Sequence, residues 1–329
     1  AGALMGVVGL VGAEWLPPFA FLNGARALVP LPGGVPGAVN GVVNPNELAG
    51  VLCWLLPLQL ACLITCLRGR RPGRVALAAA LALAMLFSGF LLLATLSRGG
   101  ILAAVLGLLL VAACHVSARW RLVLTIGVLV GLAALVAYTG SRADQNFVGD
   151  AVGMTGRLEI WSRAVLGIAD FPLTGMGVNG FRHVVDVLYP LYSVPADIDL
   201  GHAHNQLLQA ALDLGLPGLV AYVALWIISA MLLWRAYARL RQRHATHHPY
   251  FGLVAGLAGS LLAGWLFGIF DAIALGARPG FLWWLLLGLT AGVHYAVVHS
   301  GEPLLRRRRS REAAAQPAPP AMERRQRAA

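Results

Sequence analysis

The stretch that decides the fold is V-A-L-A-A-A-L-A-L-A-M-L-F-S-G-F-L-L-L-A-T-L, residues 75–96, which contains no charged side chain. An α-helix needs about 20 apolar residues to cross the hydrocarbon core of a bilayer, and this stretch has that length. Comparable apolar runs lie on both sides of it, at residues 48–67, 99–118, 122–140, 214–234, 250–270 and 281–299. The sequence therefore predicts seven complete membrane-spanning helices.

Composition and the first residues support the same fold class. Hydrophobic residues make up 58% of the 329 positions and charged residues 12%, whereas about a quarter of the residues of soluble domains are charged. An eighth apolar stretch opens the chain at Ala1 without an initiator Met, a basic segment or a cleavage signature. We expect the end of a truncated helix there rather than a signal peptide. The predicted fold is an all-α, polytopic integral membrane bundle with about eight spans.

The distribution of charge predicts the orientation of the bundle. All 25 basic residues are arginines, and basic residues accumulate in loops that stay in the cytoplasm. Arginines cluster in alternate connections, at residues 68–74, 119–121 and 235–243, and in the tail after residue 302. The opposite connections hold eleven of the fourteen acidic residues, so we expect them to face outward. The net charge of +11 lies beside helix ends, where membrane lipids are a nearer partner than nucleic acid.

One connection, at residues 140–212, is too long for a bare link between helices and too polar to cross a membrane. Long loops in compact folds usually carry function. We therefore divide the chain into N-terminal membrane helices at 1–139, an outward-facing loop with short helices at 140–212, C-terminal membrane helices at 213–300, and a disordered basic cytoplasmic tail at 301–329.

Within this loop, residues 157–169 have apolar side chains at helical spacing: Leu158, Trp161, Val165 and Ile168. This spacing predicts an amphipathic helix at the membrane interface. The run T-G-M-G-V-N-G-F that follows at residues 174–181 fits the spacing G-x-G-x-x-G, but no strand precedes it. We expect a tight turn there rather than a dinucleotide site.

Three arginines are expected on the outward side. Arg157 and Arg163 lie in the loop, and Arg98 ends an apolar helix in L-S-R-G-G. Several guanidinium groups at one membrane surface suit binding of a phosphate or pyrophosphate, and a lipid-linked phosphate is the obvious ligand there. Ordinary contacts to lipid head groups, with a Glu159–Arg163 pair, are the alternative.

His202 and His204 lie directly before a predicted membrane helix. A neutral imidazole is the commonest general base for activating a hydroxyl, and one of them could do this. An H-x-H pair can also bind zinc, but a third ligand is not evident beyond Asp197, Asp199 or His183, so we expect no metal ion. A solvated loop histidine is the alternative.

Four motifs occur in order along the chain. They are N-P-N-E-L-A (44–49), L-S-R-G-G-I-L-A (96–103), T-G-R-L-E-I-W with P-L-T-G-M-G-V-N-G-F (155–161 and 172–181), and H-N-Q-L-L-Q-A-A-L-D-L-G-L-P-G-L (204–219). Together they resemble the O-antigen ligase and O-antigen polymerase family of bacterial membrane glycosyltransferases. The resemblance implies a GT-C-like helical fold in the bacterial inner membrane, with the active site facing the periplasm.

The resemblance also implies roles for individual residues. Arg98 and Arg157 match the arginines that bind the pyrophosphate of an undecaprenyl-linked glycan, and His204 matches the histidine that activates the acceptor hydroxyl. The family needs no metal, nucleotide or other cofactor, and inversion at the anomeric carbon is expected. As further substrate-binding candidates we add Arg163, His202 and Asn205. Where many members have Glu before G-x-P-G, this chain has Asp213, whose role stays open.

The predicted function is transfer of a glycan from undecaprenyl pyrophosphate to an acceptor hydroxyl in cell-surface polysaccharide or lipopolysaccharide biosynthesis. The acceptor stays open: lipid A core for a ligase, another lipid-linked repeat for a polymerase, or a protein hydroxyl for an O-oligosaccharyltransferase. A transporter or flippase of lipid-linked sugars is the alternative, and it predicts charged groups deep in the membrane. The predicted helix interiors are nearly free of charge.

Overall fold

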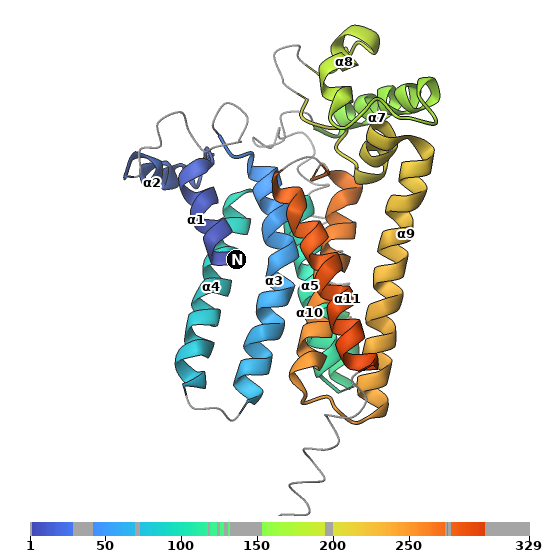
Figure 1. The fold of residues 1–329 in the computed structure, drawn as a ribbon. Helices are drawn as coiled ribbons and strands as arrows, with labels where there is room; N and C mark the ends of the chain where they lie inside the picture. Colours follow the sequence, from blue (N-terminus) through green and yellow to red (C-terminus); the bar gives the residue numbers. More distant parts are fainter. Residues whose placement is uncertain are drawn as a thin grey trace, which may run out of the picture.

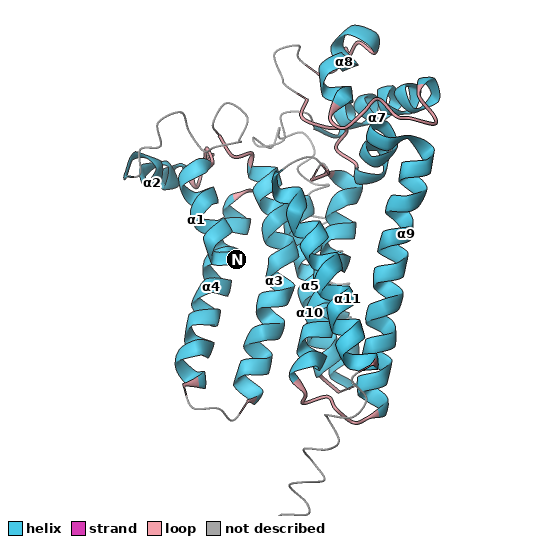
Figure 2. Cartoon of the chain, in the orientation of Figure 1, coloured by secondary structure: helices cyan, strands magenta, loops and turns pink. Residues whose placement is uncertain are grey.

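The computed structural model describes residues 2–28, 42–69, 73–117, 119–123, 126–127, 131, 153–194, 200–273, 275 and 278–299. Within these residues the chain is a bundle of α-helices with short 3-10 turns and without a β-strand (Figure 2). The all-α membrane fold predicted from the sequence is therefore confirmed.

Six helices of the described chain are long and apolar enough to cross a membrane. They are α3 (Pro45–Arg68), α4 (Arg74–Ala94), α5 (Arg98–His115), α9 (Gln206–Gln242), α10 (Pro249–Phe270) and α11 (Phe281–Val298). Each corresponds to one predicted span. The span predicted at residues 122–140 lies largely outside the described residues, and the tail at 301–329 lies wholly outside them. The opening apolar stretch forms the shorter helix α1 (Gly2–Gly12).

The two ends of the bundle differ in the structure that covers them (Figure 1), and they also differ in charge. At one end, which we call the arginine end, α3 and α9 finish in the basic segments that contain Arg68 and Arg239. At the opposite end, which we call the loop end, lie the two helices of the long loop, α7 (Gly153–Asp170) and α8 (Gly180–Leu188). The arginine-rich connections thus share one end of the bundle, as the charge pattern predicts.

Helix α10 packs against α3 and α5 through small residues. A Cβ atom added to Gly259 of α10 would lie 2.6 Å from the carbonyl oxygen of Gly107 in α5, and one added to Gly256 would lie 2.7 Å from the Ala61 Cβ atom of α3. Small residues let helix backbones approach closely where lipid replaces water as the solvent. This close packing fixes the loop end of α10, where Phe270 is followed by Asp271, relative to the starts of α3 and α5.

The long loop has its own hydrophobic core. Buried side chains from α7, α8 and the start of α9 form one cluster: Ile160, Ala164, Phe181, Val185, Leu200, Ala203 and Leu212 among others. Helix α7 begins before the predicted range and ends at Asp170, directly before Phe171-Pro172. Leu158 and Val165 are more than half exposed on its surface, in agreement with an interfacial face. Helix α8 was not predicted.

The first turns of α9 belong to the loop, because the helix is interrupted at Gly215, whose φ is +70°. Pro217 follows two residues later and has no N–H to donate to the preceding turn. The interruption separates a short segment from Gln206 to Leu214 from the membrane-spanning part. Helix α7 packs on this region of α9 at the loop end (Figure 1).

Candidate functional site

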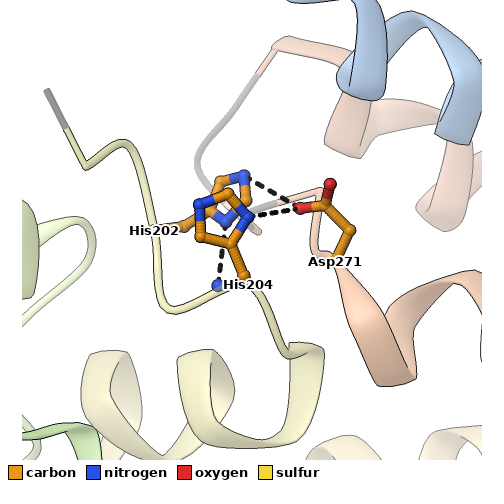
Figure 3. Close-up of side chains that lie close together, drawn as sticks. All are labelled: His202, His204 and Asp271. Atoms are coloured by element: carbon orange, nitrogen blue, oxygen red, sulfur yellow. Dashed lines mark hydrogen bonds and ion pairs between the residues drawn. The ribbon is translucent and has the colours of Figure 1, made fainter. Parts of the chain in front are cut away.

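Two histidines and one aspartate converge at the loop end of the bundle (Figure 3). His202 and His204 lie directly before α9, and Asp271 follows α10. The Nδ1 atom of His204 lies 3.2 Å from Oδ1 of Asp271, and the Nε2 atom of His202 lies 3.5 Å from the same oxygen. The side chain of Asp271 is 7% exposed, while those of His202 and His204 are 20% and 14% exposed. The carboxylate is therefore buried behind two imidazoles that water still reaches.

Asn205 explains why His204 meets Asp271. Its Oδ1 atom caps α9 by accepting from the N–H groups of Leu207 and Leu208, and its Nδ2 atom donates to the carbonyl of Ile269 at 2.9 Å. Asn is among the preferred N-cap residues because its side chain satisfies otherwise unpaired N–H groups. The second hydrogen bond fastens the start of α9 to the end of α10, two residues before Asp271. The adjacent pair His204-Asn205 thus combines a reactive side chain with the residue that positions it.

The hydrogen bonds around His202 select its tautomer. The N–H of His204 donates to Nδ1 of His202 at 3.1 Å, so in the neutral ring the proton lies on Nε2, which faces Asp271. This contact also supports the left-handed backbone of His204, whose φ of +49° is uncommon for a residue with a Cβ atom. Both ring nitrogens of His202 are engaged in contacts that position His204 and Asp271, and its predicted substrate contact stays a prediction.

The contact between Nδ1 of His204 and Oδ1 of Asp271 determines the tautomer of His204. An ionised carboxylate can only accept, so Nδ1 of His204 donates to Asp271 and Nε2 carries the lone pair. Oδ1 of Asp271 also accepts from the N–H of Ala272 at 2.8 Å. A neutral imidazole oriented by a buried carboxylate is the arrangement of a general base.

Electrostatics favour this protonation pattern. Burial alone would raise the pKa of Asp271, but the hydrogen bond from His204 and the positive charge of His202, His204 and Arg157 lower it overall. Burial lowers the pKa of His202 to about 4, assisted by Arg157 and Arg182 and opposed by Asp271. At neutral pH the cluster therefore holds an ionised Asp271 beside a neutral His202.

The same three residues have the ligand types of a metal site, since their donor atoms lie within 4.8 Å of one another. Asp271 could supply the third metal ligand that the sequence did not show. The alternatives Asp197 and Asp199 lie outside the described residues. However, a histidine that binds a metal through Nε2 normally donates a proton from Nδ1. Nδ1 of His202 instead accepts an N–H. The hydrogen bonds thus fit a proton-transfer cluster better than a metal site.

Arg157 reaches the cluster from α7. Its side chain is 9% exposed, and Nη1 donates to the carbonyl of Phe270, the residue before Asp271, at 2.5 Å. Its charge acts on both His202 and Asp271. The prediction that Arg157 and His204 belong to one site agrees with this geometry, although 47 residues separate them.

Arg98 and Arg182 complete the positive charge at the loop end. Arg98 is exposed at the start of α5, directly after Ser97, whose Oγ atom caps the helix by accepting from Gly100. Arg182 lies in α8, and its charge also acts on His202. The sequence analysis did not single out Arg182, because a lone arginine in G-F-R-H has no motif around it.

Two other candidates have structural contacts. Arg163 donates from Nε to the carbonyl of Pro190, lies 3.6 Å from Glu159, and has its guanidinium over the ring of Tyr192. These contacts stabilise the loop, and the predicted contact of Arg163 with substrate stays a prediction. Asn205 has a positioning role as well, because its amide donates to α10 and its carbonyl oxygen caps α9.

Asp213 fastens the loop to α9. Its Oδ1 atom accepts from Nε2 of Gln209 at 2.8 Å and from the N–H of Asn179 at 3.0 Å. Asn179 has a φ of +63° and precedes α8. The carboxylate therefore stabilises the turn from which α8 starts, and we assign it a structural rather than a chemical role.

The glycine-rich turn predicted at residues 174–181 is confirmed for residues 174–179, while Gly180 and Phe181 already belong to α8. The turn interlocks with the interruption in α9. The N–H of Met176 donates to the carbonyl of Leu212, and the N–H of Leu216 donates to that of Pro172. A Cβ atom at Gly175 would lie 2.6 Å from the backbone nitrogen of Gly215. The two motifs P-L-T-G-M-G and L-G-L-P-G are thus two halves of one close backbone contact.

This contact predicts a difference between two neighbouring glycines. Gly175→Ala is expected to destabilise the loop by roughly 3 kcal/mol, because it adds a backbone clash to the strain of a φ of +66°. Gly177 has a φ of +85° but open space around a Cβ atom, so Gly177→Ala is expected to cost only about 1 kcal/mol. Thermal unfolding and protease sensitivity of the loop in detergent would check this order. Equal losses would contradict the interlock.

The neutral state of His202 predicts that the loop weakens in acid. Its pKa is about 4 in the folded chain and about 6.5 in an unfolded one. The unfolded state therefore binds the extra proton between these values, and stability is expected to fall as the pH drops from about 6.5 to about 4. His202→Gln keeps a donor for Asp271 but does not titrate. Unfolding temperatures at pH 7.5 and 4.5 should differ less in this variant; an unchanged difference would rule His202 out as the cause.

Together, the fold and the site define a polytopic membrane protein with a buried His–Asp pair and basic residues at one end of its helices. The family model for O-antigen ligase matches residues 80–223, and this match supports the resemblance to that family predicted from the motifs. The match supports a glycosyltransferase-like enzyme with a role in membrane glycan transfer for polysaccharide biosynthesis. No curated protein matches the chain.

Proposed function

We propose that the chain transfers a glycan from an undecaprenyl-pyrophosphate carrier to an acceptor hydroxyl at the periplasmic face of the bacterial inner membrane. The observation that carries this proposal is the imidazole of His204, which donates from Nδ1 to the buried carboxylate of Asp271 and leaves Nε2 to accept a proton. We expect the loop end to face outward, because the arginine-rich connections lie at the opposite end of the bundle. A carrier glycan that has reached the periplasm would meet the site there.

In the proposed reaction, Nε2 of His204 removes the proton of the acceptor hydroxyl as its oxygen attacks the anomeric carbon of the donor glycan. The bond between that carbon and the pyrophosphate oxygen breaks, and the bonding electrons leave with the lipid pyrophosphate. Asp271 stabilises the imidazolium that forms, because an anion 3.2 Å from Nδ1 favours the protonated ring. Attack opposite the leaving group inverts the anomeric centre. The steps use no metal ion.

The arginines act on the leaving group. A pyrophosphate leaves readily once its charge is neutralised, and a guanidinium can bind two phosphate oxygens at once. Arg157 is held beside Asp271 by its hydrogen bond to Phe270, and we place the pyrophosphate between Arg157 and Arg98. Removing one donor of this kind from a charge-stabilising site typically costs about 10²–10³-fold in rate.

The acceptor is left open by the site, since lipid A core, a second lipid-linked repeat and a protein side chain all offer a hydroxyl. Cells that lack the protein would distinguish a ligase, which uses lipid A core, from a polymerase, which uses a second lipid-linked repeat. Loss of a polymerase leaves single repeats, whereas loss of a ligase leaves long glycans on the carrier.

Reconstitution in proteoliposomes tests the proposal against transport. The purified chain would receive an undecaprenyl-pyrophosphate-linked glycan and, in separate reactions, a lipid A core, a second carrier-linked repeat or a peptide with free hydroxyls. A glycosylated acceptor with free undecaprenyl pyrophosphate supports transfer. Movement of the intact donor across the bilayer without any product would instead identify a flippase and overturn the proposal.

A further inference from the structure

An apolar groove of about 590 Å³ lies between α5, α9 and α10, in the membrane-spanning part of the bundle. Small side chains leave this space, since Ala113, Ala230, Ala255 and Ala258 are among the lining residues. Among the described lining residues Arg121, which follows α5, carries the one charge. Ligand sites commonly have volumes of about 300–1,000 Å³ with a few well-placed polar groups.

The apolar lining is about as long as one acyl chain. On α9 its lining runs from Trp226 to Tyr237, and on α10 from Val254 to Trp265. Eleven residues of α-helix rise about 16 Å, which is roughly half of a hydrocarbon core of about 30 Å. The rings of Trp226 and Trp265 lie 5.4 Å apart at the end of the lining nearer the loop end, where the carbonyl of Trp265 accepts from Gln206. The other end of the lining, at Tyr237 and Val254, lies toward the arginine end.

Positive charge gathers at the end of the groove that lies toward the arginine end of the bundle. Arg121 lines the groove itself. The guanidinium of Arg241 lies 5.8 Å from the ring centre of Tyr237, which also lines it. Both arginines are within electrostatic reach of Cys114, a third lining residue. Basic pockets between membrane helices on the cytoplasmic side typically bind anionic lipid head groups.

We propose that this groove binds an anionic phospholipid from the leaflet at the arginine end. One acyl chain lies along Ala230 and Ala258, and the phosphate lies between Arg121 and Arg241. The position of the charge decides between two amphiphiles. An isoprenoid carrier serving the His204 site would have its pyrophosphate at the loop end, whereas the arginines of this groove lie at the opposite end. The proposal does not depend on glycan transfer.

Native mass spectrometry of the purified chain with phosphatidylglycerol and phosphatidylcholine of identical acyl chains tests this site. The wild-type chain is expected to retain phosphatidylglycerol roughly tenfold more strongly. Arg121→Gln should lose that preference, while Arg119→Gln, an exposed neighbour outside the groove, should keep it. Ala230→Phe should fill the groove and release both lipids, while Ala221→Phe on the exposed surface of α9 should not.

Each variant would first be checked for a single peak in gel filtration and for unchanged helix content. Because Ala221→Phe adds the same ring to the same helix, it separates loss of the lipid from damage to the fold. Equal retention of the two lipids by the wild-type chain would overturn the proposal, as would retention by Ala230→Phe. Preference for undecaprenyl phosphate over phosphatidylglycerol, lost in Ala230→Phe, would also overturn it and assign the groove to a prenyl chain.

Discussion

Asp271→Asn is expected to lower the rate of glycan transfer by about 10²–10⁴-fold. Asn keeps the size of the side chain and an Oδ1 atom that can accept from His204, His202 and the N–H of Ala272. It removes the negative charge that stabilises the imidazolium of His204 in the transition state. The substitution therefore separates the charge of Asp271 from its shape. The measurement is the transfer rate in proteoliposomes under saturating acceptor.

Asp186→Asn is the matched control, because Asp186 is exposed on α8 of the same loop. It changes the net charge by the same amount and should transfer at the wild-type rate. If Asp271→Asn transferred as fast as this control, the carboxylate would have no part in proton transfer, and His204 would need another explanation.

Arg157→Gln is expected to reduce kcat/KM for the lipid-linked donor by about 10²–10³-fold. The Gln side chain can still donate a hydrogen bond, but it cannot neutralise a pyrophosphate. Arg157→Lys should recover part of the loss, because a lysine restores the charge without the planar, two-pronged donor of a guanidinium. The experiment is a titration of the donor with each variant, with the acceptor held constant.

Arg163→Gln provides the comparison on the same helix. Arg163 holds the segment at Pro190 and Tyr192 in place, so its loss should raise the protease sensitivity of the loop and change donor affinity little. A larger loss of kcat/KM in Arg163→Gln than in Arg157→Gln would show that the pyrophosphate lies elsewhere on α7.

The membrane helices were predictable because their signal is local. An uncharged run such as residues 75–96 has one stable structure in a bilayer, where every backbone N–H needs an internal partner. Helix α7 was predictable from spacing as well. Helix α8 carries a similar signal, since Phe181, Val185 and Leu188 are at helical spacing and the first two are buried. The glycines around it directed attention to the turn instead.

The partner of His204 was not predictable in the same way. Asp271 is 67 residues further along the chain, and the contact depends on how α9 and α10 pack. In the sequence Asp271 and Asp213 look alike, since each lies at the outward end of an apolar run. The structure separates them, because Asp213 accepts from Asn179 and Gln209, whereas Asp271 faces two histidines.

The substrate contacts predicted for His202 and Asn205 stay predictions, and the structure adds positioning contacts that the sequence did not show. Short polar side chains beside a helix start satisfy the nearest backbone groups, and the sequence does not show which side chain keeps a nitrogen or oxygen for a ligand. Asn205 caps α9 and His202 accepts from the N–H of His204, whereas in the proposed reaction His204 uses Nε2 to accept the proton of the acceptor.

A comparison of the wild-type chain with two histidine variants tests whether His204 is the base that activates the acceptor hydroxyl. Glycan transfer would be measured in proteoliposomes for the wild-type chain, for His204→Ala and for His183→Ala, an exposed histidine of the same loop. If His204 is the base, His204→Ala is expected to bind the lipid-linked donor but to form no product, while His183→Ala is expected to transfer the glycan normally. Product formation by His204→Ala at the wild-type rate would contradict it.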